Sequence, residues 1–203
     1  MTLLLETYMN LNDVKKLEEA RQRADAAATA LKERNDAAKA QHLKKAADEF
    51  RDYFSAAGFT VSPTPQGMIA AVGQTAFKLE LDSNDRFGAF GMVRITPPAG
   101  AKEEPTTVLL VRKQESHFTS TTFHAQALTP LQEMEKKAAD FEAALARPFP
   151  EMVFVIQKVA QAHVAPYGSR PKPHTSPLSG SRELFESFTE VLSKLYPTSE
   201  SGL

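Results

Sequence analysis

The first third of the chain has the composition and apolar spacing that are typical of one long helix. Residues 13–57 contain neither Gly nor Pro and consist mainly of Ala, Lys, Glu, Arg, Gln and Leu, which are strong helix formers. Gly58 suits the left-handed position that closes a helix, and Phe59 can then fold back on Phe54. The pattern therefore predicts a helix over 13–57. Either Asn10 or Asn12 can cap the start of this helix, because its side-chain oxygen can accept a hydrogen bond from a free backbone N–H.

A single helix over 13–57 would be long for a small globular domain. It would extend about 68 Å at about 1.5 Å per residue, whereas a compact chain of this size has a radius of gyration of roughly 17 Å. Such a helix must project, pack on a partner, or break into a hairpin. The most suitable break is Arg34-Asn35-Asp36, because Asn tolerates the left-handed region and Asp can cap a new helix. The unbroken helix is the preferred interpretation, and the hairpin is the alternative.

Small apolar residues recur at a seven-residue step along this predicted helix. Such a seam is typical of helices that pack closely, and it predicts a self-associating arm that forms a coiled coil. The repeat is imperfect, because Arg21 and Asn35 occupy the second core-like position. The alternative is a long helix within an intramolecular bundle. The residues predicted to mediate self-association are Leu17, Ala24, Leu31, Ala38, Leu43 and Phe50.

The hydrophobic pattern changes to period two over residues 59–127, which is typical of half-buried strands. The clearest example is 76–82, where Phe77, Leu79 and Leu81 alternate with charged residues. Short connections between the strands favour an antiparallel meander. The strands predicted in this region are 67–72, 76–82, 88–96, 107–113 and 117–127.

Helices and one more strand are predicted in the last third of the chain. Thr129 and Gln132 form a capping box at the start of a helix over 130–146, and Pro stands at its first position. Residues 152–160 are an apolar run of strand length, and their β-branched residues favour a buried strand. A final helix is expected over 182–196, because its apolar residues have helical spacing.

These elements together predict an α+β fold. It consists of a long N-terminal helix or helical hairpin, an antiparallel meander of about five to six strands, and packed C-terminal helices. Two domains are expected, a helical arm over 1–58 and an α+β globular domain over 59–203. The globular domain includes a basic, Pro-rich loop over 165–177.

The composition narrows the classes of protein. Lys and Arg number 24 against 25 Asp and Glu, so a globally basic polyanion binder is excluded. The absence of Cys excludes a disulfide-stapled secreted fold, thiolate metal sites and a cysteine nucleophile. The apolar start of the chain is too short for a signal peptide, and no apolar run approaches the ~20 residues that span a bilayer. A cytoplasmic protein without a membrane segment is expected.

One segment departs from this balanced charge. Residues 152–182 contain four basic residues and neither Asp nor Glu, and four prolines fall within 165–177. Prolines hold a chain extended, so a basic strand with one aromatic residue can follow a phosphate backbone or an acidic groove. The simpler interpretation is a solvated linker to the last helix. The residues predicted to contact a partner or nucleic acid are Lys158, Tyr167, Arg170, Lys172 and Arg182.

No motif in the sequence predicts a catalytic or metal site. The five His residues lack zinc-ligand spacing, and the phosphate-loop, nucleophile-elbow and dinucleotide motifs are absent. Three carboxylates lie near the end of a predicted strand, those of Glu80, Asp82 and Asp85, and hard cations prefer such oxygen ligands. A polar strand face followed by a turn explains these residues fully without a metal. The sequence therefore predicts no catalytic residue, metal or cofactor. An active site that is assembled only in space stays open.

Two functions are compatible with these observations. The first is a non-enzymatic protein–protein interaction module (an adaptor, inhibitor or assembly subunit) that self-associates through its helical arm and binds a protein partner. The over-long helix and the lack of a catalytic motif favour it. The second is a nucleic-acid accessory protein that uses residues 158–182 as an anchoring strand. Its affinity for nucleic acid would fall steeply as the salt concentration rises.

Overall fold

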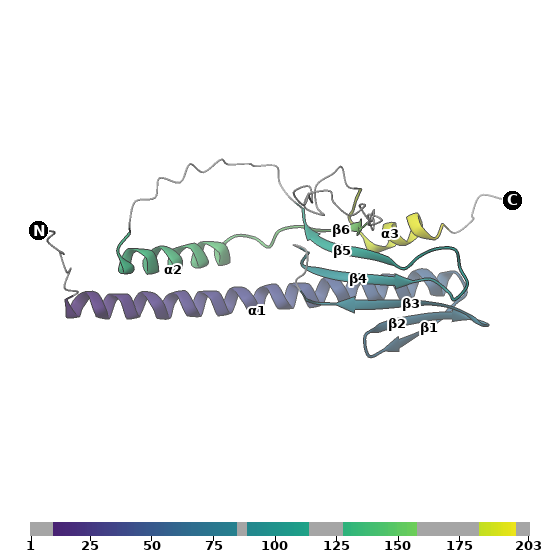
Figure 1. Cartoon of the computed structure of the whole chain (residues 1–203), viewed down its shortest axis with the longest axis horizontal. Coiled ribbons are helices and arrows are strands. Elements are labelled where there is room, and N and C mark those ends of the chain that lie inside the picture. The colour runs from purple at the N-terminus through teal and green to yellow at the C-terminus, as the bar shows by residue number, and fades with distance from the viewer. Residues whose placement is uncertain (1–9, 85–88, 114–127, 158–182, 198–203) are drawn as a thin grey trace, which may run out of the picture. The chain divides into compact units, whose positions relative to one another are not determined.

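A computed structural model describes residues 10–84, 89–113, 128–157 and 183–197 (Figure 1). The chain divides into two compact units, which are described separately. Unit 1 comprises Met1–Ala38 and Glu115–Phe149, and unit 2 comprises Lys39–Gln114 and Pro150–Leu203. The division by contacts falls within the first helix, whereas the sequence pattern suggests a boundary after residue 58.

Helix α1 (Leu11–Ala56) is continuous, which confirms the unbroken helix and not the hairpin. Asn10 caps its start, because the Oδ1 atom of Asn10 accepts a hydrogen bond from the backbone N–H of Asp13 at 2.9 Å. Asn35 and Asp36 do not interrupt the helix. Strong helix formers continue on both sides of them, and their propensity outweighs that of one Asn-Asp pair.

The C-terminal end of α1 closes as the sequence predicts. Gly58 has a φ of 85°, in the left-handed region where Gly is favoured. The backbone N–H of Phe59 donates to the carbonyl oxygen of Phe54 at 2.9 Å, and that of Gly58 donates to Ser55 at 3.0 Å. The Phe54 and Phe59 rings then pack edge to face with centroids 5.3 Å apart. This is a Schellman closure with its hydrophobic contact.

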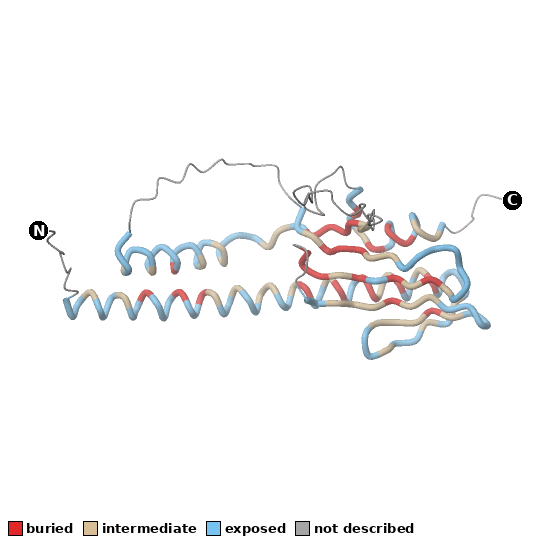
Figure 2. Tube along the Cα trace, in the orientation of Figure 1, coloured by how far each residue is buried: buried red, intermediate tan, exposed pale blue. Residues whose placement is uncertain are grey.

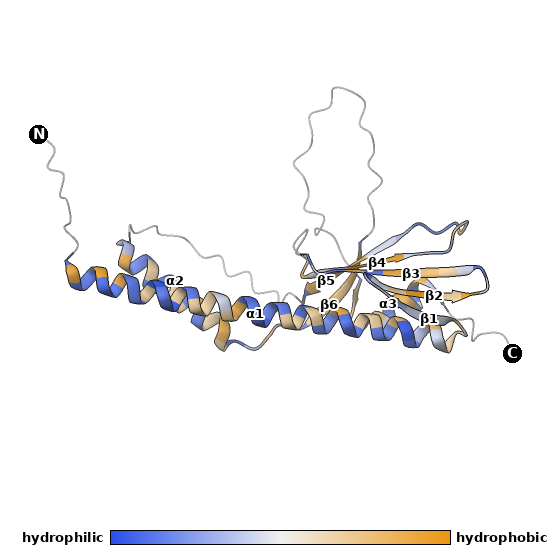
Figure 3. Ribbon diagram, turned by 90° about the horizontal axis from the view of Figure 1, so that it is seen from below, coloured by the Kyte–Doolittle hydropathy of each residue, from blue (hydrophilic) through white to orange (hydrophobic). Residues whose placement is uncertain are grey.

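Unit 1 pairs the first part of α1 with helix α2 (Pro130–Ala146), and the two helices lie side by side in Figures 1 and 3. The predicted capping box of α2 is present. The N–H of Gln132 donates to the Thr129 hydroxyl at 3.3 Å, and the N–H of Thr129 donates to the Gln132 side chain at 3.0 Å. The sequence therefore identified this helix and its start correctly.

Unit 2 contains an antiparallel meander, as the sequence predicts. Within the described residues, seven strands follow one another across one sheet in chain order, each antiparallel to its neighbour. The strands are β1 (Thr60–Thr64), β2 (Gly67–Val72), β3 (Thr75–Asp82), β4 (Gly91–Thr96), β5 (Thr106–Arg112), β6 (Met152–Gln157) and β7 (Leu184–Phe185).

The strand count is slightly higher than predicted, because the two edge strands were not expected. Strand β1 contains Pro63, which removes a backbone donor and obscures the strand pattern, but an edge strand tolerates it. Strand β7 is only two residues long and pairs through Leu184 and Phe185 with β6. The predicted strand over 117–127 lies outside the described residues.

The final helix is shorter than predicted. Helix α3 is Phe188–Leu195, whereas the apolar spacing predicted 182–196. The predicted start of the helix was wrong. Leu184 and Phe185 continue the helical spacing of apolar residues toward the N-terminus, but in the structure they form strand β7 and pair with β6. Ser187 caps α3 instead, and its hydroxyl accepts from the N–H of Glu190 at 3.2 Å.

One face of the sheet carries most of the core of unit 2, and the opposite face also contains the buried residues Leu109, Val153 and Val155. The residues of α1 from 39 onwards and helix α3 lie along the first face (Figures 1 and 3). Alternate residues of the strands are buried on the same face, and Figure 2 shows where buried residues lie along the trace. The helices contribute Leu43, Phe50, Phe54, Phe188, Val191 and Leu192, and the strands contribute Leu79, Val93, Ile95, Val108 and Leu110. Among the described residues, no helix is long and apolar enough to cross a membrane.

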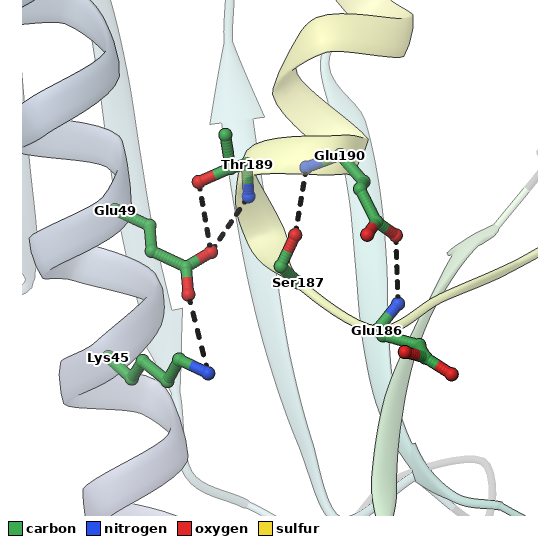
Figure 4. Close-up of polar contacts among 6 residues, drawn as sticks. All are labelled: Lys45, Glu49, Glu186, Ser187, Thr189 and Glu190. Atoms are coloured by element: carbon green, nitrogen blue, oxygen red, sulfur yellow. Dashed lines mark hydrogen bonds and ion pairs between the residues drawn. The ribbon is translucent and has the colours of Figure 1, made fainter.

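A carboxylate ties α3 to α1 within unit 2. Figure 4 shows Glu49 of α1, whose Oε2 atom accepts hydrogen bonds from the backbone N–H of Thr189 at 2.8 Å and from its hydroxyl at 3.3 Å. Lys45 lies 3.7 Å from the other carboxylate oxygen. A negative charge at the first turn of a helix is favourable, because free N–H groups point toward it.

Candidate interaction surfaces

The residues predicted to contact nucleic acid lie outside the described residues, so that hypothesis stays a prediction. This applies to Lys158, Tyr167, Arg170, Lys172 and Arg182, and to the loop 165–177. The described residues nevertheless contain two surfaces with features of a binding site. One lies on the helix pair of unit 1, and the other lies on the sheet of unit 2.

The residues predicted for self-association are divided between the two units. Leu43 and Phe50 are buried in the core of unit 2. Leu43 packs close to Gly91 of β4, because a Cβ atom added to that glycine would lie 3.4 Å from the Leu43 side chain. Ala24 is fully buried in unit 1. The three other residues are half-buried in unit 1, namely Leu17, Leu31 and Ala38. Only these partly exposed positions can offer apolar surface to another chain.

An alanine seam runs along the side of α1 that faces α2. Ala20, Ala24 and Ala27 are buried, and Ala138 is the buried residue of α2. Alanine lets helix backbones approach closely, but each one removes little apolar area from water. The seam alone therefore supplies a thin core for unit 1.

An ion pair closes one side of this helix pair. The Nε and Nη2 atoms of Arg23 donate to the two carboxylate oxygens of Glu142 at 3.0 and 2.7 Å. The pair is exposed, so its contribution to stability is small, but its two-pronged geometry fixes the direction of approach.

Arg34 holds the C-terminal end of α2. Its Nη1 atom donates to the carbonyl oxygens of Leu145 and Arg147 at 2.9 and 3.1 Å, and its Nη2 atom donates to that of Ala144 at 3.1 Å. These carbonyls belong to the last turn of α2, where partners within the helix are missing. The guanidinium also lies 5.9 Å from the centroid of the Phe149 ring. We call this set of contacts the Arg34 clamp.

Replacing Arg34 by Met is expected to loosen the last turn of α2, because three carbonyl oxygens lose a charged donor. The expected loss is about 2 kcal/mol of local stability, or roughly 30-fold faster amide exchange near residue 145. Hydrogen–deuterium exchange with mass spectrometry measures this change. Lys32→Met is the matched control, because Lys32 is exposed on the same helix. Equal exchange in both variants would argue against the clamp.

The other side of the helix pair is apolar. Successive residues of a helix turn by about 100°. This places Leu17 on the edge of the α1 seam opposite to Arg23, and it places Leu31 within the seam, between the directions of Ala20 and Ala24. The same construction places Met134 and Phe141 on the edge of the α2 seam opposite to Glu142. The side chains of Leu17, Met134 and Phe141 are half-buried, and we call these three residues the apolar flank.

A polar groove of about 480 Å³ lies on the face of the sheet opposite to α1 and α3. The strand registers place Glu80 opposite Arg94, Arg94 opposite Thr107, and Thr107 opposite Gln157. Directly opposed residues point to the same face, so these four side chains form one row across β3 to β6. The groove is lined by Gln66, Glu80, Leu81, Asp82, Asn84, Met92, Arg94, Thr107 and Gln157.

The two acidic groups of the groove already have partners. The ammonium group of Lys78 donates to Glu80 at 2.7 Å, and this hydrogen bond lowers the pKa of Glu80. Asp82 accepts from the backbone and side-chain nitrogens of Asn84 at 2.9 and 2.7 Å. Glu80 therefore lies on a strand face and Asp82 accepts the hydrogen bonds of an Asx turn, whereas Asp85 lies outside the described residues. The described residues contain no group of three His, Cys, Asp or Glu that can hold a metal ion.

Comparison with known proteins gives no match to a family model, to a curated protein or to a solved structure. Function must therefore be inferred from the two surfaces themselves. The sequence analysis named Leu17 and Leu31, whose role in self-association stays a prediction, but it did not name Arg34 or the row that contains Arg94. Their partners are far away in the sequence, so spacing along the chain carries no signal for them.

Proposed function

We propose that the protein is a non-enzymatic interaction module, of the adaptor, inhibitor or assembly type, that self-associates through unit 1. The observation that carries this proposal is the apolar flank. Three large apolar side chains line one side of a helix pair whose own seam is mostly alanine. The opposite side is closed by the ion pair of Arg23 and Glu142.

A second copy of the chain is the occupant that fits this flank. Two helices enclose little apolar area, and helical proteins usually bury such a stripe against further helices. Two copies that join their flanks form a four-helix arrangement with leucine, methionine and phenylalanine in its centre. Residues 11–38 contain six acidic and six basic residues, and residues 130–146 contain four acidic and two basic ones. The two helices therefore carry a net charge of only −2 per copy, so the repulsion between two copies is small. Each assembly then presents two copies of the sheet to partner proteins.

The double variant Leu17→Lys/Phe141→Lys tests this arrangement. We expect it to be monomeric at concentrations where the unaltered chain is a dimer, because two charges per copy would have to be buried at the contact. Light scattering after size-exclusion chromatography measures the mass. The matched control is Thr29→Lys/Ala143→Lys, which adds the same charges at exposed positions away from the flank. Circular dichroism of both variants verifies that the helices are retained.

A monomeric unaltered chain, or a dimer that survives in the flank variant, would contradict self-association through unit 1. Nuclease treatment before the measurement tests the alternative, in which the protein is a nucleic-acid accessory that uses residues 158–182. An assembly that disappears after this treatment, and that weakens steeply with salt, would favour that alternative.

A further inference from the structure

The polar groove contains hydrogen-bonding groups that the protein itself does not use. In the described part of the chain, the side chains of Gln66, Arg94, Thr107 and Gln157 make no hydrogen bond. Arg94 is exposed and offers five N–H donors in a rigid fork. Thr107 and the two glutamines offer both donors and acceptors. A ligand that enters the groove therefore meets one cationic fork and three neutral polar groups.

The charges around this fork limit the ligand. Glu80 and Asp82 line the same groove, and Lys78 and Arg94 offset them, so the four charges sum to zero. A phosphate group, with a charge near −2, would approach two carboxylates and would be disfavoured by them. A single carboxylate matches the guanidinium fork in geometry and carries only one charge.

The shape of the groove indicates what carries that carboxylate. Neighbouring strands are about 4.8 Å apart, so the row from Glu80 to Gln157 covers roughly 14 Å, the length of about four extended residues. Main-chain amides of such a segment match the free groups of Thr107 and Gln157. The volume of about 480 Å³ falls within the range of ligand sites.

We propose that the polar groove binds an extended peptide segment of a partner protein and that Arg94 anchors a carboxylate of this segment. The carboxylate can be an acidic side chain or a C-terminal carboxylate, because both present the same two oxygens. Glu80, which Lys78 holds in place, orients the peptide by repelling its carboxylate toward Arg94. This inference does not depend on self-association, and the flank variant should bind peptide as well as the unaltered chain.

A titration with three acetylated pentapeptides, followed by ¹H–¹⁵N NMR, tests the proposal. The first is Gly-Ser-Glu-Ser-Gly with an amidated C-terminus. The second has Gln in place of Glu, and the third has this Gln and a free C-terminal carboxylate. We expect at least one carboxylate peptide to shift the signals of Thr107 and Gln157. Its affinity should exceed that of the neutral peptide by roughly tenfold or more. The stronger of the two carboxylate peptides identifies the source of the carboxylate.

The variant Arg94→Gln should lose this preference, and Arg21→Gln should keep it, because Arg21 is an exposed arginine of α1 far from the groove in sequence and in a different unit. Unchanged amide spectra away from the groove would show that Arg94→Gln retains the fold. Equal binding of the three peptides, absence of binding at millimolar concentration, or tighter binding of inorganic phosphate than of either carboxylate would overturn the proposal. Retained preference in Arg94→Gln would overturn it as well.

Discussion

Replacing Phe50 by Ala is expected to destabilise unit 2 by about 3–5 kcal/mol, which is typical for removing a fully buried aromatic side chain. Phe50 has no exposed surface, and its ring centroid lies 4.6 Å from that of Phe54. Phe54 in turn packs against Phe77 of β3, with centroids 4.8 Å apart. The substitution therefore opens a cavity at the point where α1 meets the sheet.

A urea titration followed by tyrosine fluorescence and circular dichroism measures this loss. Tyr53 and Tyr196 lie in the same aromatic cluster of unit 2 and report on its unfolding. The control is Val72→Ala in the same sheet, where the side chain is 48% exposed and the expected loss is below about 1 kcal/mol. A loss of similar size in both variants would mean that α1 is not packed against the sheet.

The Phe50 experiment also separates two roles of one helix. The sequence pattern treats residues 13–57 as a single arm, because a seven-residue step cannot reveal what each part of the stripe faces. In the structure, the part of α1 before residue 38 pairs with α2 in unit 1, and the later part fills the core of unit 2. The later part contains Phe50 and Phe54, whereas the earlier part is closed mostly by alanine. Large aromatic residues therefore mark the section that the sheet covers.

Features that depend on neighbours in the sequence could be predicted. The Schellman closure at Gly58 and the capping box at Thr129 each need only residues within one turn, and both are present. The turn between β2 and β3 is similar, because Gly73 adopts a φ of 57° and only a local backbone conformation is required. Period two identified β3 for the same reason.

Features that depend on distant partners could not be predicted. The Arg34 clamp joins residues more than a hundred positions apart, and Arg34 looks like any other basic residue of a polar helix. Lys39 is only 7% exposed and donates to the carbonyl oxygen of Ser83 at 2.9 Å, although its sequence context indicates a solvated charge. The row of the polar groove depends on strand register. A shift of one residue in the pairing of a strand would move its side chain in this row to the other face of the sheet.

Replacing Gly67 by Ala is expected to disrupt the start of β2 and to cost about 3 kcal/mol or more. A Cβ at this position would lie 2.1 Å from the carbonyl oxygen of Leu79 and 2.9 Å from its carbonyl carbon. Both contacts are with backbone atoms of the paired strand, so no side chain can move away to relieve them. The backbone of β2 or β3 must shift instead, and the register that places Gly67 opposite Glu80 is lost.

Gly73→Ala is the matched control for this prediction. Gly73 also has a positive φ, of 57°, but a Cβ there meets nothing within 4 Å. Its expected cost is therefore only that of the left-handed backbone, about 1 kcal/mol. Thermal unfolding compares the two variants, and NMR signals of Glu80 and Arg94 report whether the row of the polar groove changes. A similar loss of stability in both variants would show that the contact with the Leu79 backbone does not determine the cost of a side chain at Gly67. An unchanged groove in a strongly destabilised Gly67→Ala protein would show that the row is held by β3 to β6 without the register of β2.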